Sequence, residues 1–487
     1  MDRILESCPP RRVRVVCASQ EFSAREMAHG SGRWLSGSRA VWESLSVGAR
    51  PDLVVIQLQA PPLGEHVLDF LFGCLPSRRE DVRDRHALVD VADDRPMHLS
   101  EKVATDTELI ERIARTIRVA RRSGHVIEGL SCYASSISMA RLARLWDIPL
   151  LDTCPELLVW GTKSGARQLF RAANIPHLEG SYHVSRGVDD LVQTLARLTR
   201  RLDSPAWMVK LDHGFGSGHG NSVVDTRTLG KPITAKTLAQ ASCPCSERTT
   251  TTEFLDLVEQ YGCIVERRIE AAPGSALAWP SALAYLSRSS HDAPVQVEFL
   301  GVHDQLIGST GEFHACRYPA DGRYRQQVIS LSGKLFARLA QLGVTGHAGV
   351  DFIAEPAVGR LWAVEINLRQ TGTTHPHRTA RACIRGAWRA DGTAAYSNGG
   401  EVHYKATDAI SSPHYVGIGS AELISALQSA PTVAFDPATG TGTIPHLWST
   451  LAPHGKIGAT FFSTSIEGCD QLETAFVQLL ETLATGR

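Results

Sequence analysis

Apolar and polar positions in the first third of the chain alternate between the periods of strands and helices. The strand candidates are four short apolar runs, at 13–17, 53–56, 87–91 and 125–127. A helix follows a cap at Thr105 or Asp106, and another spans about 135–146. Strands that alternate with helices indicate a mostly parallel sheet. The first strand is not followed by Gly-x-Gly-x-x-Gly, so the pattern does not predict a dinucleotide site.

The rest of the chain reads as mixed helix and strand. A helix is predicted to begin near Lys163, a hairpin is predicted within 281–308, and two leucine-rich stripes predict helices near 331–339 and 472–483. The polar, Thr-rich residues 226–252 are expected to form a surface excursion. Residues 386–400, rich in Gly, Ala, Asn and Ser, are expected to form a loop.

The run Trp362–Arg369 carries the most informative pattern, because it alternates strictly. Val364, Ile366 and Leu368 are predicted to face a core. Glu365, Asn367 and Arg369 are then lined up on the other face, about 7 Å apart. A carboxylate, an amide oxygen and a guanidinium on one surface are suited to bind a metal ion and a phosphate.

A second carboxylate is predicted to join this face. Pro356 and Gly359 supply turn residues after the strand candidate 349–353, so Asp351 is expected opposite Glu365. Two carboxylates at that separation resist joint ionisation unless a cation lies between them. Together with Asn367 they form an all-oxygen set that suits Mg²⁺ and implies a nucleotide. Taken alone, the hairpin is equally compatible with an ordinary solvated face.

Two further segments suggest phosphate and nucleotide contacts. Lys210 ends a strand candidate and precedes the glycine-dense stretch 213–220, which is followed by another strand. Glycines allow backbone N–H groups to approach phosphates, although a flexible hairpin tip would have the same composition. A short strand ending in Glu266 can offer its carboxylate to an adenine edge. The segment Gly161–Ser164 is not a Walker A loop, because it lacks the glycine directly before the lysine and the earlier glycine of that motif.

Bulk properties exclude several classes of protein. The chain has 487 residues, 43% of them hydrophobic, which favours two to four domains. A net charge of −1 gives no basic footprint for nucleic acid. No apolar run reaches the length of a membrane span, and the first residues lack the apolar core of a signal peptide, so a cytoplasmic protein is predicted. The 11 cysteines lack paired clusters, which favours reduced thiols over a zinc site.

The order of these segments resembles the motif sequence of the ATP-grasp superfamily, in which two α+β lobes hold ATP between them. The resemblance implies ATP and Mg²⁺ as cofactors. Phosphate contacts are expected from Lys163, Lys210 and the loop residues Gly216, Ser217 and Gly218. Adenine contacts are expected from Glu266 and the backbone of Ile269, and Glu270 is a further ATP-binding candidate. Magnesium ligands are expected at Asp351, Glu365 and Asn367.

A narrower resemblance covers nearly the whole chain. The chain is similar to the pheganomycin-type peptide ligases, which are carboxylate–amine ligases. The matching segments include Lys163–Arg167, Cys316–Pro319, Glu365–Arg369 with Thr373–Pro376, and Gly455–Gly458. The chain departs from the pattern at Gln370, where glycine is expected.

The resemblance implies a domain order. A Rossmann-like α/β pre-ATP-grasp domain is expected over 1–155, followed by a two-lobed α+β ATP-grasp fold over 156–385. Within the latter, the lid lobe is expected at about 175–270 and the metal and phosphate lobe at about 271–385. A C-terminal region, 386–487, is expected to pack on the ATP-grasp core.

The implied reaction joins a small acid to an amine, such as an amino acid or peptide, through an acyl phosphate. Arg369 and Arg317 are the candidate catalytic arginines, and the 213–220 lid is expected to close over the intermediate. Thr373, Thr374 and His375 are expected to contact substrate, since proline separates His375 from His377 and no third metal ligand is near in sequence. A small-molecule kinase on the same fold is the alternative, and a homodimer is a family-level expectation.

Overall fold

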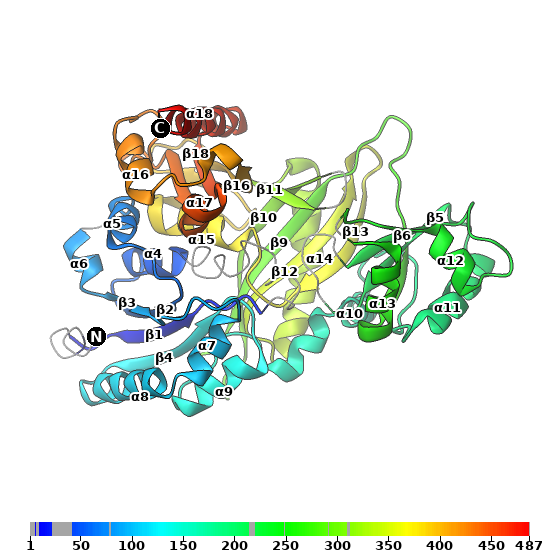
Figure 1. Cartoon of the computed structure of the whole chain (residues 1–487), viewed down its shortest axis with the longest axis horizontal. Helices are drawn as coiled ribbons and strands as arrows, with labels where there is room; N and C mark the ends of the chain where they lie inside the picture. Colours follow the sequence, from blue (N-terminus) through cyan, green and yellow to red (C-terminus); the bar gives the residue numbers. More distant parts are fainter. Residues whose placement is uncertain are drawn as a thin grey trace.

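The computed structural model describes residue 5 and residues 9–21, 41–76, 79–213, 220–247, 249–290, 292–308 and 312–486. The N-terminal and C-terminal parts of the chain lie side by side at one end of the molecule, and a small lobe containing β5 and β6 projects at the other end (Figure 1). A large sheet occupies the middle, between these two ends. Among the described residues, none of the helices combines the length and the apolar character needed to cross a membrane.

The N-terminal domain is built on a parallel sheet of four strands, as predicted. The strands, in the order β3-β2-β1-β4, are β1 (Arg12–Cys17), β2 (Leu53–Gln59), β3 (His86–Asp90) and β4 (Val126–Cys132). The helices are α4 (Val41–Ala49), α5 (Glu65–Gly73), α6 (Arg79–Arg83), α7 (Leu99–Thr105), α8 (Thr107–Arg122) and α9 (Ile137–Leu145). Asp106 caps α8 by accepting a hydrogen bond from Leu109 N, which confirms one of the two predicted caps.

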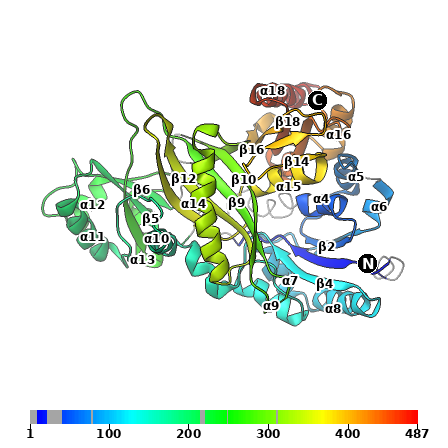
Figure 2. The same cartoon turned by 180° about the vertical axis from the view of Figure 1, so that it is seen from behind.

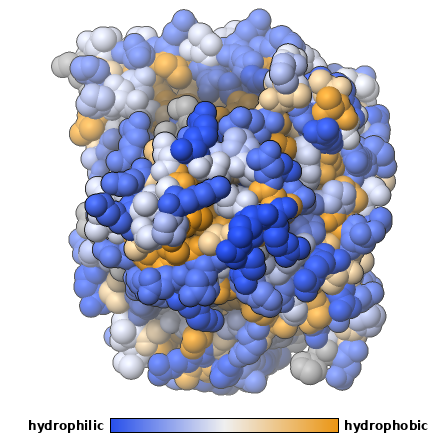
Figure 3. All heavy atoms as spheres, turned by 90° about the vertical axis from the view of Figure 1, so that its right-hand side faces the viewer, coloured by the Kyte–Doolittle hydropathy of each residue, from blue (hydrophilic) through white to orange (hydrophobic). Residues whose placement is uncertain are grey.

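The lid lobe carries a four-stranded antiparallel sheet. Its strands, in the order β7-β6-β5-β8, are β5 (Ala206–Leu211), β6 (Asn221–Asp225), β7 (Ser242–Pro244) and β8 (Cys263–Arg267). Its helices are α11 (Val188–Arg201), α12 (Ala235–Ala241) and α13 (Thr251–Tyr261). The prediction of a surface excursion over 226–252 is wrong, because α12 and β7 lie within it and β7 completes the sheet edge. Seen from this end, the surface is largely hydrophilic, with apolar residues gathered near its centre (Figure 3).

The large sheet has eight strands in the order β13-β12-β9-β10-β11-β16-β18-β17. They are β9 (Trp279–Ser287), β10 (Gln296–Ile307), β11 (Phe313–Tyr318), β12 (Gly346–Glu355), β13 (Arg360–Asn367), β16 (His403–Ser411), β17 (Gly442–His446) and β18 (Lys456–Ser463). All neighbours are antiparallel, and β9 with β10 forms the predicted hairpin. The C-terminal strands are hydrogen-bonded into this sheet, so it crosses the predicted boundary near residue 385.

Helices cover both faces of the large sheet. The helix α14 (Gly322–Gln341) lies across one face (Figure 2), and Tyr324 on it donates a hydrogen bond to Asp304 of β10. The helix α15 (Thr374–Cys383) covers the opposite face, where His377 hydrogen-bonds to the hydroxyl of Tyr404 on β16. Asp304 therefore faces α14, and Tyr404 faces α15. Because neighbouring strand residues point to opposite faces, the faces of the residues next to these two follow by alternation.

The remaining elements connect and cover these sheets. They are η1 (Pro155–Gly161), α10 (Lys163–Ala172), η2 (Pro356–Val358), β14 (Gly386–Trp388), β15 (Ala394–Tyr396), η3 (Pro413–Tyr415), α16 (Ser420–Gln428), α17 (Trp448–His454) and α18 (Ile466–Thr485). The predicted loop at 386–400 is a hairpin of β14 and β15, which corrects that expectation. One apolar core contains residues of α4, α5, α15 and the C-terminal region together, so the N-terminal domain and the C-terminal strands are packed as a unit.

Candidate active site

The two carboxylates that the sequence predicts to face each other are paired across adjacent strands. Asp351 on β12 lies opposite Glu365 on β13 in the antiparallel register. The turn between them contains Pro356 and ends at Gly359, whose φ of 66° favours glycine. The register prediction is therefore confirmed. Cross-strand neighbours have Cβ atoms about 5 Å apart, so the two carboxyl groups share one face of the sheet.

A β-bulge corrects the predicted alternation of β13. Phe352 pairs with Ala363 while Asp351 pairs with Glu365, which leaves Val364 as an extra residue on its strand. Ala363 and Ile366 belong to the buried core, whereas Val364 does not. A bulge sets two successive residues against one partner residue. The predicted core position of Val364 is therefore wrong, and the bulge keeps Glu365 facing Asp351.

Asp351 is held by amide donors on either side. Gln305 Nε2 donates to its Oδ1 at 3.1 Å, and Asn367 Nδ2 donates to its Oδ2 at 2.9 Å. Burial, followed by the neighbouring charge of Glu365, raises the pKa of Asp351 to about 6. The pair therefore resists joint ionisation, as two carboxylates do without a cation between them.

Lys163 supplies a positive charge to the same face. It opens α10, whose N-cap Thr162 accepts a hydrogen bond from Gly165 N, and its ammonium forms an ion pair with Glu365. Burial would raise the pKa of Glu365, but Lys163 and then Arg369 outweigh burial and lower it. The side chain of Lys163 is only 9% exposed, so this charge is poorly screened by water.

Lys210 and Glu266 form an ion pair, and Arg167, which the sequence analysis did not name as a site residue, also pairs with Glu266. Glu266 is buried on β8, and its two oxygens lie 2.6 Å from Lys210 Nζ and 2.8 Å from Arg167 Nη1. Burial would raise the pKa of Glu266, while Lys210 and Arg167 lower it below its usual value. The carboxylate therefore has two cationic partners inside the protein. The sequence did offer one indication that Arg167 belongs to the site. Arg167 lies four residues after Lys163 on the same predicted helix, so the two side chains share one helix face.

The structure describes only some of the remaining candidates for nucleotide contacts. Ile269 is half-buried and Glu270 is exposed just after β8, where the backbone leaves the lid sheet. Their nucleotide contacts stay predictions. Gly216, Ser217 and Gly218 lie outside the described residues.

The structure separates the two candidate catalytic arginines. Arg369 follows β13 directly, and its charge acts on both Asp351 and Glu365. Arg317 on β11 is paired with Asp304, and so shares the face covered by α14, opposite to that of Gln305. There its Nη2 donates to Asp470 on α18 at 2.9 Å. Arg317 is therefore not brought to the carboxylate pair.

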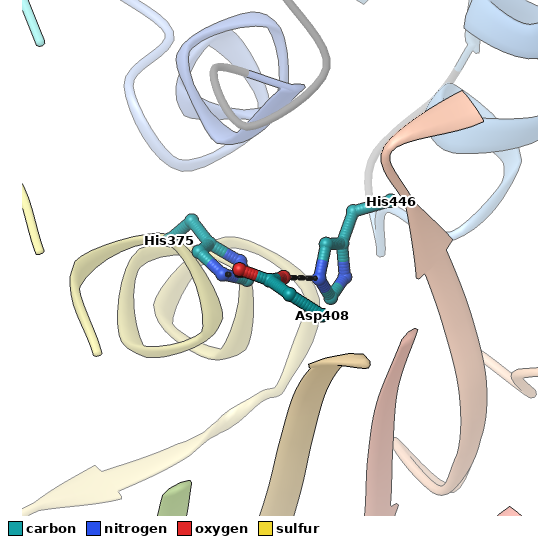
Figure 4. A group of neighbouring side chains, drawn as sticks. All are labelled: His375, Asp408 and His446. Carbon is teal, nitrogen blue, oxygen red and sulfur yellow. Dashed lines mark hydrogen bonds and ion pairs between the residues drawn. The ribbon is translucent and has the colours of Figure 1, made fainter. Parts of the chain in front are cut away.

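Thr373, Thr374 and His375 are all buried where α15 begins. Thr371 N donates to the hydroxyl of Thr374 at 2.9 Å, and the hydroxyls of Thr371 and Thr373 lie 2.9 Å apart, which shapes a tight turn. His375 lies beside Asp408 and His446, two metal-type ligands that are distant from it in the sequence but close to it in space (Figure 4). Substrate contacts by these residues remain predictions.

Comparisons with known proteins agree with this geometry. A family described as "IQCH-like, ATP-grasp" matches residues 156–253, which include Lys163 and Lys210. The biotin carboxylase–β-γ-ATP complex from Campylobacter jejuni aligns with a TM-score of 0.56 over 98% of this chain and 95% of that chain, at 12% identity. The biotin carboxylase domain of the Hydrogenobacter thermophilus 2-oxoglutarate carboxylase, in complex with MgADP, gives 0.53 over 98% and 95%, also at 12% identity. The match to the ATP-grasp family model covers residues 156–253, and the two solved structures share the fold of this chain.

A relative of known activity extends the likeness beyond the fold. The L-propargylglycine--L-glutamate ligase of Streptantibioticus cattleyicolor is 29% identical over 432 residues, covering 88% of this chain and 85% of that protein. A match of this length extends well beyond residues 156–253, which the family model covers.

The donor set of the candidate site fits magnesium and a nucleotide. Asp351, Glu365 and Asn367 offer only oxygen ligands, which Mg²⁺ prefers. Asp351 and Glu365 face each other on paired strands, and a divalent cation between them would offset their mutual repulsion. Lys163 forms an ion pair with Glu365 on this face, and its contact with phosphate stays a prediction.

Gln370, at the position where the resemblance led us to expect glycine, links the candidate site to the N-terminal domain. Its Oε1 accepts a hydrogen bond from Trp42 Nε1 at 3.0 Å, and its Nε2 donates to the carbonyl of Cys132 at 3.1 Å. The backbone N of Gln370 also donates to Tyr133 O at 2.9 Å. Glycine could make only the backbone contact, so the side chain is what joins α4 and the end of β4 to the strand carrying Glu365.

Proposed function

We propose that this chain is an ATP-grasp enzyme, namely an ATP-dependent ligase that joins a small carboxylic acid to an amine, with release of ADP and phosphate. The observation that carries the proposal is the partly buried face formed by Asp351, Glu365, Asn367 and Lys163, with Arg369 beside it. It offers charge neutralisation without a protein nucleophile among the residues identified. The likeness to the L-propargylglycine--L-glutamate ligase supports an amino acid as acid, as amine, or as both.

The reaction balances in two steps. A carboxylate oxygen of the acid attacks the γ-phosphorus of ATP, and the bond to the bridging oxygen breaks to give an acyl phosphate and ADP. The amine nitrogen then attacks the acyl carbon, loses a proton, and expels inorganic phosphate. Such transfers depend mainly on positioning and on stabilisation of charge. Bound Mg²⁺ would neutralise phosphate charge at Asp351, Glu365 and Asn367.

Each cationic residue has a distinct place in this scheme. Lys163, held at the start of α10 beside Glu365, would contact the phosphate chain from the large sheet. Lys210, held by Glu266, would contact it from the lid lobe. Arg369 would stabilise the oxyanion that forms when the amine attacks, because its charge already acts on the carboxylate pair.

The acid is proposed to bind at the carboxyl edge of the N-terminal sheet. Gln20 follows β1, Gln59 ends β2 and Ser135 follows β4, and all three are buried. Both amide atoms of each glutamine and the hydroxyl of Ser135 have no hydrogen-bond partner among the described residues. Buried polar groups are rarely left unpaired, so a polar ligand is expected to pair with them. Ligands of open parallel sheets bind at this edge.

The same edge lies against the ATP-grasp site. Arg369 forms an isolated antiparallel bridge with Ala134, one residue before Ser135. β1 runs toward the large sheet, so its carboxyl end faces the middle of the molecule (Figure 1). An acid held at this edge would therefore have Arg369 near its reacting carboxylate.

A pairwise screen tests the proposal. The full-length protein is incubated with ATP, Mg²⁺ and pairs of amino acids or short peptides, and ADP release is followed with mass spectrometry of the products. The expected result is ADP release that requires both an acid and an amine, with one amide formed per ADP. A phosphorylated product made without any amine would instead identify a kinase, and formation of AMP would contradict the acyl-phosphate route.

A further inference from the structure

A second cluster of potential ligands lies away from the magnesium face. His375 at the start of α15, Asp408 on β16 and His446 at the end of β17 bring one ligand atom each to within 4.8 Å of one another. Figure 4 shows the two imidazole rings on either side of the Asp408 carboxylate. All three residues are buried. They come from three elements that are far apart in the sequence, so the fold itself assembles the group.

The separations between the ligand atoms suit a single transition-metal ion. His446 Nε2 lies 2.6 Å and His375 Nε2 lies 3.8 Å from the same oxygen of Asp408, Oδ1. Zinc binds nitrogen and oxygen at about 2.0–2.1 Å in tetrahedral geometry, which places neighbouring ligand atoms about 3.3 Å apart. The two observed separations bracket that value, so small rotations of the side chains would complete the geometry.

The position of the His446 ring is built into the neighbouring strand. His446 pairs with Gly458 on β18, and a Cβ atom on Gly458 would lie only 2.2 Å from His446 Nε2. Only glycine leaves room for the ring at that position. The strand pairing therefore keeps His446 Nε2 beside Asp408, and Nε2 is the ring nitrogen that would bind the ion.

We propose that His375, Asp408 and His446 bind a divalent transition-metal ion of the zinc class. Two imidazoles and one carboxylate are a donor set for zinc and not for Mg²⁺, which takes oxygen ligands. The chain would then bind two different cations, with Mg²⁺ at the nucleotide face and zinc at this site. The zinc ion would fix the start of α15, which directly follows the Thr371–Thr374 turn, to the C-terminal strands β16 and β17.

The test uses the full-length protein and zinc itself. The protein is stripped with a chelator, returned to zinc in the presence of excess Mg²⁺, and analysed by mass spectrometry of metals and by competition with a chromophoric chelator. The expected result is about one zinc per chain that Mg²⁺ does not displace. Asp408→Asn and His446→Gln should each weaken zinc binding by more than about tenfold.

A matched control separates the site from general histidine binding. His403 lies at the other end of β16, and its Nε2 is 3.6 Å from the carboxylate of Glu401. His403→Gln therefore removes a histidine of the same strand that also lies near a carboxylate. This control should keep full zinc binding. Zinc should also raise the melting temperature of the wild type in proportion to the logarithm of its concentration.

Two results would overturn the proposal. One is a wild-type protein that takes up no zinc more tightly than about micromolar and whose Co²⁺ form shows no absorption from a nitrogen- and oxygen-ligated site. The other is equal zinc binding by wild type and by folded Asp408→Asn or His446→Gln. Circular dichroism establishes folding, and the wild-type measurements decide the question if neither variant folds. None of these readouts depends on ligase activity, so the proposed function is tested separately.

Discussion

Replacing Glu365 with glutamine should abolish most activity while leaving the fold intact. Removing its charge relieves the repulsion with Asp351 across the strand pair. Two unit charges about 5 Å apart at an effective dielectric constant of about 20 repel by about 3 kcal/mol. The ion pair with Lys163 is lost at the same time, and its worth is of similar size. The two changes nearly cancel, so we expect the melting temperature of the variant to stay close to that of wild type.

The effect on catalysis should be much larger than the effect on stability. Loss of one charged group that stabilises developing charge costs about 10²–10³-fold in kcat. We expect such a fall in amine-dependent ADP release, with partial recovery at high Mg²⁺ because the weakened site can be refilled. Glu298→Gln, on the same sheet but half-exposed with ion pairs of 3.7 and 3.8 Å, is the control and should keep activity. Wild-type activity in Glu365→Gln would refute the magnesium assignment.

Three further predictions address the acid site, the domain link and the arginines. Gln59→Leu should raise KM for the acid by about tenfold with KM for ATP unchanged, and equal shifts in both constants would contradict the proposed acid site. Gln370→Leu should lower the free energy of unfolding by about 1–3 kcal/mol in urea titrations, because it leaves Trp42 Nε1 buried without its partner. Arg369→Lys should lower kcat by about 100-fold, whereas Arg317→Ala should change it by less than about threefold, and the reverse order would restore Arg317 as the catalytic arginine.

Local sequence was enough to predict the carboxylate pair. The strand containing Asp351 and the strand containing Glu365 are joined by a short turn with Pro356 and Gly359, so the register follows from counting residues. The bulge at Val364 could not be predicted, because an apolar residue at that position continues the alternating pattern perfectly. The bulge is set by the pairing with β12, which the strand's own sequence does not record.

The helices in and after residues 226–252 could have been predicted from local sequence. Residues 226–252 look like a surface excursion by composition, yet the end of this stretch carries Thr250 three residues before Glu253. That spacing is a capping box, and in the structure the Glu253 side chain accepts from Thr250 N while Thr250 Oγ1 accepts from Glu253 N. Thr234 and Thr237 cap α12 in the same reciprocal way. Cap spacing was more informative here than polarity.

Long-range contacts were beyond sequence reasoning. Gln370 and Trp42 are 328 positions apart, and their hydrogen bond depends on how the N-terminal domain docks on the large sheet. His375, Asp408 and His446 converge only because β16, β18 and β17 extend that sheet. Gly458 belongs to a segment that matches the related ligases, but the sequence does not explain why glycine stands there. The explanation is the ring of His446, which lies against Gly458 because β17 pairs with β18.

Transfer of an oxygen isotope tests the central claim most directly. An acid substrate labelled with ¹⁸O in both carboxylate oxygens is ligated to an unlabelled amine in the presence of ATP, and the products are analysed by mass spectrometry. The acyl-phosphate route predicts one ¹⁸O in the released phosphate and one in the new amide for every ADP formed. Labelled amide formed together with unlabelled phosphate, with the second label in AMP or in water, would contradict it.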